Sequence, residues 1–129
     1  FEIRNFGYIK EQEKMNEFFS MADVLLNPSV YETFGLVNIE AMASGTPVVA
    51  FNICVMPEVI GIEGGWIVRE VSADALCSCL ESLEKDRAEV EEKAETCVEC
   101  VREYYNEEEM LDAFDRLYET IKKERQNGR

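Results

Sequence analysis

Glu32 and Glu40 are the residues whose type and spacing best suit chemistry on a ligand. Seven residues separate the two carboxylates, and Gly35 lies between them, where a helix is predicted to begin. Glu32 falls in the loop before that helix and Glu40 about a turn and a half into it, so we do not expect a close acid–base pair.

The predicted start of this helix, Phe34-Gly35-Leu36-Val37, is suited to bind an anion. Free backbone N–H groups and the positive end of a helix can meet phosphate oxygens, and a glycine lets the backbone approach closely. Such a helix end contributes about 0.3–2 kcal/mol, which is too little to hold a diphosphate alone.

Each of these residues also has an ordinary structural interpretation. Glu40 alone could be an exposed helical residue, Glu32 a loop acid, and Gly35 and Gly45 turn glycines. The ordered set in a strand–turn–helix context favours a ligand site.

The stretch from Pro28 to Ala50 closely resembles the donor-binding signature of the family 4 retaining glycosyltransferases. The resemblance extends more loosely from Phe1 to about Asp86. Further features recur in the family's order, namely Gly7, Ala22-Asp23, Pro28-Ser29 and Pro57-Glu58. The resemblance implies part of a GT-B enzyme, whose two Rossmann-like domains hold a nucleotide-sugar between them. This chain would be the C-terminal, donor-binding part.

The two glutamates have distinct roles by this resemblance. Glu32 would be the catalytic residue, which hydrogen-bonds hydroxyls of the transferred sugar and stabilises charge near the anomeric carbon. Glu40 would accept from the two ribose hydroxyls, a bidentate task that suits a carboxylate. The implied reaction is transfer of a hexose from a nucleotide diphosphate-sugar to a saccharide or lipid-linked acceptor, with retention of configuration.

The resemblance also implies contacts from backbone amides and a base pocket. The amides of Phe34 and Gly35 would bind sugar hydroxyls, those of Leu36 and Val37 the distal phosphate, while Tyr8 and Ile9 would line the base pocket.

The lack of basic residues argues against activity of the isolated chain. Between Lys14 and Arg69 there is no lysine or arginine. The family balances the diphosphate with an Arg and a Lys from the first half of the same domain, which this chain lacks. We therefore expect weak binding or none, and no transfer. No Asp-x-Asp pair stands at a predicted strand end, so neither a divalent metal nor a cofactor is indicated.

Composition limits the classes of protein. The 129 residues, 47% of them hydrophobic, suit one domain over residues 1–129. The net charge of −14 argues against a nucleic-acid or anionic-membrane partner. No apolar run is long enough for a transmembrane segment, which predicts a cytoplasmic protein. The start at Phe1 favours a segment of a longer protein.

Five cysteines and no histidine are present. Cys79 and Cys97 fall on apolar helical stripes, so we expect buried reduced thiols rather than the metal or redox site that a Cys-x-x-Cys pair can form. Without histidine, nucleophiles that need an imidazole base are excluded.

The hydrophobic pattern predicts an α/β fold with about three main parallel strands, half of a Rossmann-like sheet, and flanking helices. Residues 1–70 would form the donor-site part and 71–129 a helical part. The predicted strands are Phe1–Ile9, Asp23–Asn27 and Pro47–Phe51, with a small strand at Trp66–Val68. The predicted helices are Glu11–Met21, Phe34 or Gly35 to Gly45, a short one at Pro57, Ala73–Leu83, Ala88–Tyr105, and a last one capped near Asn106.

In the strand order 3-2-1-4-5-6, the three main strands would be the fourth, fifth and sixth. The first of them would then leave an exposed edge, for the missing N-terminal part of the enzyme, a second copy or the C-terminal helices to cover. The alternative function is a non-catalytic α/β module that binds a partner or a second copy through its apolar helical face.

Overall fold

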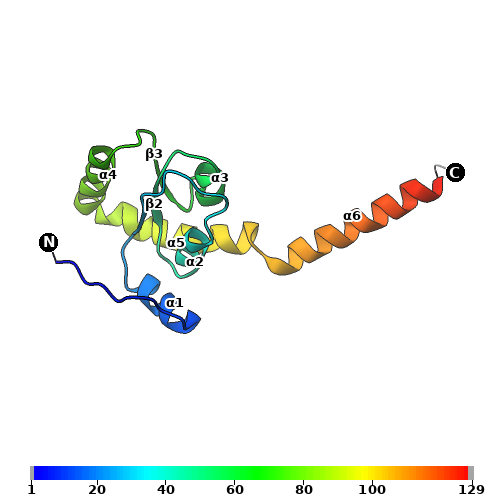
Figure 1. Cartoon of the computed structure of the whole chain (residues 1–129), viewed down its shortest axis with the longest axis horizontal. Coiled ribbons are helices and arrows are strands. Elements are labelled where there is room, and N and C mark those ends of the chain that lie inside the picture. Colours follow the sequence, from blue (N-terminus) through cyan, green and yellow to red (C-terminus); the bar gives the residue numbers. More distant parts are fainter. Residues whose placement is uncertain (1, 128–129) are drawn as a thin grey trace.

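The computed structural model describes residues 2–127 and contains one three-stranded parallel sheet in the order β1-β2-β3 (Figure 1). The strands are β1 (Leu25–Asn27), β2 (Val48–Phe51) and β3 (Gly65–Val68). In register, Leu25 lies opposite Val48, which lies opposite Gly65. The helices are α1 (Gln12–Ser20), α2 (Leu36–Ala43), α3 (Met56–Ile60), α4 (Ala73–Lys85), α5 (Arg87–Tyr104) and α6 (Glu107–Asn127).

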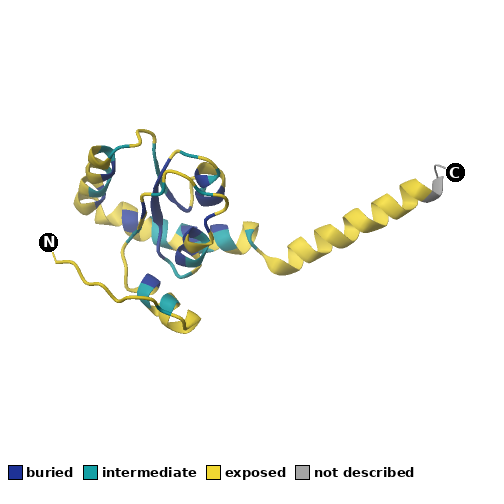
Figure 2. Ribbon diagram, viewed as in Figure 1, coloured by how far each residue is buried: buried dark blue, intermediate teal, exposed yellow. Residues whose placement is uncertain are grey.

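The core lies on both faces of β2, all four residues of which are buried (Figure 2). One face packs against α1, α2, α3 and α5, with Met42, Met56 and Cys97 among its buried side chains. The other packs against α4 and the start of α5, through Leu76, Leu83 and Val90. The apolar run Val48–Phe51 has no polar side because a central parallel strand is covered on both faces.

The strand predicted over Phe1–Ile9 is wrong within the described residues, because residues 2–10 form no helix or strand. Phe1 lies outside the described residues. Within the described residues the sheet instead begins with β1, and its strand order is β1-β2-β3. With no strand beside it, the segment packs Phe6 on Phe18, with ring centroids 4.5 Å apart.

The other predicted elements are confirmed, with ends shifted by a few residues. Two of these helices begin with a side chain that caps the first turn. The Ser72 hydroxyl accepts from the Ala75 N–H before α4. The Asn106 side chain accepts from the N–H groups of Glu108 and Glu109, which confirms the predicted cap of the last helix.

Helix α6 extends away from the rest of the molecule (Figure 1), and every one of its described side chains is exposed (Figure 2). Its predicted apolar face is present but covers no part of the sheet. We call this face the α6 stripe, and it consists of Met110, Leu111, Phe114, Leu117, Tyr118 and Ile121. Among residues 2–127, no helix has the length and apolar character needed to cross a bilayer.

The five cysteines are free thiols. Cys97 is fully buried and confirms the predicted core position, whereas Cys79 is only partly buried. Burial raises the pKa of Cys97 to about 11. Within the described part of the chain, no group of three potential ligands could hold a metal ion.

Candidate functional site

The loop after β1, residues 28–35, and the start of α2 carry most of the predicted site. Gly35 precedes the helix in the left-handed conformation, with φ 79° and ψ 53°. A Cβ atom at this position would lie 2.6 Å from Asn38 Nδ2 and 3.2 Å from Glu32 Cγ. Gly35 is therefore required both by its backbone angles and by the lack of space beside it.

The amino end of α2 is open to a ligand. No side chain caps it, and helix geometry leaves the first N–H groups, including those of Leu36 and Val37, without intrahelical partners. Leu36 and Val37 are both exposed. This helix end therefore has free N–H donors and the positive potential of a helix amino terminus.

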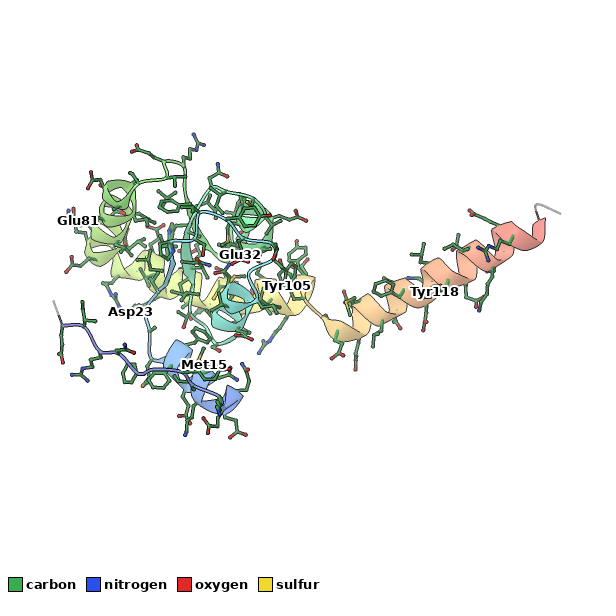
Figure 3. The ribbon with its side chains drawn as sticks, viewed as in Figure 1. Met15, Asp23, Glu32, Glu81, Tyr105 and Tyr118 are labelled. Atoms are coloured by element: carbon green, nitrogen blue, oxygen red, sulfur yellow. The ribbon has the colours of Figure 1, made fainter. Side chains whose placement is uncertain are left out.

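Glu32 lies at this helix end. Its Oε1 accepts from the Thr33 N–H at 2.9 Å, and its Cγ packs close to Gly35. Figure 3 labels Glu32 on the loop. Glu40 lies further along α2 and is partly buried. The two carboxylates are therefore carried by one loop–helix unit, at separate positions along it.

A hollow of about 320 Å³ lies beside the loop. Phe34 stands at its edge and meets Tyr105 in a T-shaped pair, with ring centroids 6.3 Å apart. The Tyr105 hydroxyl donates to the Val59 carbonyl at 3.0 Å. Burial, followed by the nearby Cys100 and Glu58, raises the pKa of Tyr105. The lining residues are Phe34, Val55, Glu58, Val59, Tyr104 and Tyr105.

The sequence predicts a short helix at Pro57. Pro57 is in the first turn of α3, and Glu58 lines the hollow. Tyr105 was not predicted to contribute. Its position at the end of the predicted helix Ala88–Tyr105 is the only signal that the sequence carried.

Tyr8 and Ile9 are not joined to this unit. They lie in the irregular segment before α1, where Tyr8 is 87% exposed. No hydrogen bond recorded for residues 2–127 connects them with residues 28–40. Their base-pocket role stays a prediction.

The described basic side chains make their contacts elsewhere. Lys14 pairs with Glu11, Arg87 pairs with Asp23, which raises the pKa of Arg87, and Lys93 donates to the Ile62 carbonyl. No ion pair recorded in the described part of the chain involves loop 28–35. In that part of the chain, the loop therefore has no ion-paired cationic side chain.

Two buried amides next to the loop were missed by sequence reasoning. Asn27 ends β1 and Asn38 lies in the first turn of α2, and the Asn27 Nδ2 donates to the Asn38 Oδ1 at 2.9 Å. A signal was present, because Asn38 is polar yet precedes the core residues Ala41 and Met42 at helical spacing.

Comparison with known proteins gives the family. The Glycosyl transferases group 1 family matches residues 2–104. O-antigen chain mannosyltransferase B of Escherichia coli is 36% identical over 85 residues, which cover 65% of this chain and 22% of that protein. N-acetyl-alpha-D-glucosaminyl L-malate synthase of Bacillus anthracis is 27% identical over 123 residues, which cover 95% of this chain and 32% of that protein.

A solved structure shows the same fold. Sucrose-phosphate synthase from Thermosynechococcus elongatus superposes with a TM-score of 0.74 and 34% identity, over 84% of this chain and 28% of that one. The chain spans about a third or less of each of these proteins. The family match takes in both the loop after β1 and all of α2, and the chain belongs to the group 1 glycosyl transferases.

Proposed function

We propose that this chain is the donor-binding portion of a retaining, metal-independent, cytoplasmic glycosyltransferase of family 4 with the GT-B architecture. The reaction would transfer a hexose from a nucleotide diphosphate-sugar to a saccharide or lipid-linked acceptor. The observation that carries the proposal is the start of α2. There, an uncapped helix end follows left-handed Gly35, and the Glu32 side chain packs against that glycine.

The charge and spacing of the two glutamates suggest that each would contact a different part of the ligand. A carboxylate accepts hydrogen bonds from hydroxyls and repels phosphate, so Glu32 suits the transferred sugar, where it would stabilise positive charge at the anomeric carbon. The open amides of Leu36 and Val37 suit the distal phosphate, and those of Phe34 and Gly35 the sugar hydroxyls. Glu40 is four residues past the helix start, about 6 Å along the axis, which suits the ribose hydroxyls.

Binding by the isolated chain is expected to be weak. The helix end supplies about 0.3–2 kcal/mol, and the described ion pairs place no cation on loop 28–35. We propose that the missing charge, and the acceptor site, belong to an N-terminal part that the longer relatives contain. The isolated chain is then expected to transfer nothing.

The test is an NMR titration of the ¹⁵N-labelled chain with millimolar UDP-glucose and GDP-mannose. At least one donor should shift the amide signals of Phe34, Gly35, Leu36 and Val37. Glu32→Gln and Glu40→Gln should weaken that response, whereas the matched change Glu81→Gln, on the exposed face of α4, should leave it intact.

Two results would count against this proposal. If neither donor shifts the amide signals at the start of α2, the proposed donor site is wrong. Micromolar affinity by calorimetry would show that the site needs no further cations and would overturn the proposed need for an N-terminal part.

A second candidate function rests on α6. Its apolar stripe is exposed along the helix, which suits a non-catalytic module that binds a partner or a second copy. Light scattering over a range of concentrations tests self-association. Leu111→Gln combined with Leu117→Gln should abolish any concentration-dependent mass, whereas Asp112→Asn, on the same helix outside the stripe, should preserve it. A monomer at all concentrations would exclude the second copy.

A further inference from the structure

The amide pair of Asn27 and Asn38 lies at the carboxyl edge of the sheet, directly under loop 28–35. Asn38 is fully buried and Asn27 is 7% exposed. Their side chains join the last residue of β1 to the first turn of α2, across a loop that carries Glu32 and Gly35. Ligands of open α/β sheets bind at this edge, so rigidity here bears directly on the proposed site.

The orientation of both amides is determined by a backbone group. The Ser29 N–H can only donate, and it donates to the Asn27 Oδ1 at 3.1 Å. The Asn27 Nδ2 must then face Asn38, which makes the Asn38 Oδ1 its acceptor. The Asn38 Nδ2 is left to donate to the Met56 Sδ, at 3.2 Å. One chain of hydrogen bonds therefore links β1, the loop, α2 and the first residue of α3.

The same Asn38 Nδ2 limits what can stand at Gly35. A Cβ atom on Gly35 would lie 2.6 Å from this nitrogen. The Asn38 side-chain amide therefore fills the space that a side chain at position 35 would need. The Asn38 N–H also donates to the Gly35 carbonyl at 2.9 Å. The side chain and the backbone N–H of Asn38 therefore both lie against the Gly35 turn that precedes α2.

We propose that Asn38 is a positioning residue of the donor site, which holds loop 28–35 through Asn27 and so sets where Glu32 and the free amides of α2 lie. This inference rests on the proposed donor-binding function. Asn38 does not touch the ligand in this scheme. It acts through the loop, and an apolar residue of the same size cannot replace it because the Asn27 amide would lose its acceptor.

The experiment compares Asn38→Leu with Thr46→Val in the full 129-residue chain. Thr46 is also fully buried, and its hydroxyl donates to the Phe19 carbonyl, far from the loop. Asn38→Leu removes the two side-chain hydrogen bonds of Asn38, and Thr46→Val removes that of the Thr46 hydroxyl. Both changes should therefore lower the melting temperature. Only Asn38→Leu should shift the amide signals of residues 29–37 and speed their hydrogen exchange, by about tenfold or more.

Loop signals in Asn38→Leu that match those in Thr46→Val would overturn the inference. If Asn38→Leu does not fold, Asn38→Ser, which is too short to reach both Asn27 and Met56, decides the question by the same signals. The ligand gives a separate readout. Millimolar UDP-glucose or GDP-mannose should move the wild-type amides of residues 34–37 more than those of Asn38→Leu. If no ligand moves the wild-type amides, the proposed function fails, while the loop signals alone still decide the role of Asn38.

Discussion

The α/β body, residues 12–104, and helix α6 use apolar side chains in opposite ways. In the body, Met42, Met56 and Ile60 are completely buried between helices and the sheet. In α6, the stripe has the same kind of side chains at helical spacing, yet each one is exposed. Periodicity makes a helix amphipathic, but only a neighbouring element makes it part of a core. The family match ends at residue 104, at the boundary between these two regions.

The largest expected difference is between two methionines. Met42→Ala removes a fully buried side chain and should lower the free energy of unfolding by about 2–5 kcal/mol. Met110→Ala removes the same atoms from α6, where the side chain is 52% exposed, and should change it by less than about 0.5 kcal/mol. Chemical denaturation followed by circular dichroism measures both. Equal losses would show that α6 is packed against something in solution.

The buried thiol of Cys97 makes the folded body sensitive to alkaline pH. Burial raises the pKa of Cys97 from 9.0 to about 11, so the folded chain keeps a proton that the unfolded chain releases first. The resulting stability is complete below pH 9 and is lost as pH rises toward 11, by up to about 2–3 kcal/mol. Unfolding at pH 8 and pH 10.5 should show this loss in the wild type but a smaller one in Cys97→Ala. The exposed Cys77→Ala should behave as the wild type.

Tight packing in the body should extend to the loop at the candidate site. Gly35→Ala places a methyl group against Asn38 and Glu32 in a left-handed conformation. Gly45→Ala has a similar φ of +81°, but its nearest neighbours, Val98 Cγ2 and the Ala94 carbonyl oxygen, lie at ordinary contact distances of 3.8 and 3.9 Å. Both should lose about 1–2 kcal/mol from backbone strain, and Gly35→Ala should lose roughly 1 kcal/mol more from the clash. Thermal unfolding measures the difference, and equal losses would mean that the loop has room to move.

The smallest expected effect lies at the junction of the two regions. Tyr105→Phe removes the hydroxyl that donates to the Val59 carbonyl and should lower the free energy of unfolding by about 0.5–1.5 kcal/mol. Tyr104→Phe, at a position 69% exposed, is the matched control and should have no measurable effect. If the two variants behave alike, the end of α5 is not held by this hydrogen bond.

The comparison also shows which features a sequence can predict. The strand β2, the helix predicted over Ala73–Leu83 and the start of α2 near Gly35 follow from local periodicity and local backbone needs, and the structure confirms them. The strand predicted over Phe1–Ile9 is wrong for the described residues 2–9, because a strand requires a hydrogen-bonded neighbour and these residues pair with none.

Contacts between residues far apart in the sequence could not be predicted either. Asn38 was missed because its burial depends on Asn27, eleven residues earlier, and on Met56, eighteen residues later. The apolar face of the last helix was predicted, but no pattern within the helix tells whether anything covers it. The same limit applies to Tyr105, whose contact with Phe34 spans most of the chain.

The single helix break at Tyr105–Asn106 makes α6 a lever. With 21 residues, the helix is about 30 Å long, so a rotation of roughly 10° at the break would sweep its far tip through about 5 Å. Tyr105, at the pivot, touches Phe34 on the loop of the candidate site. A rotation of α6 at this break would therefore also move the Tyr105 ring against Phe34, the residue before Gly35.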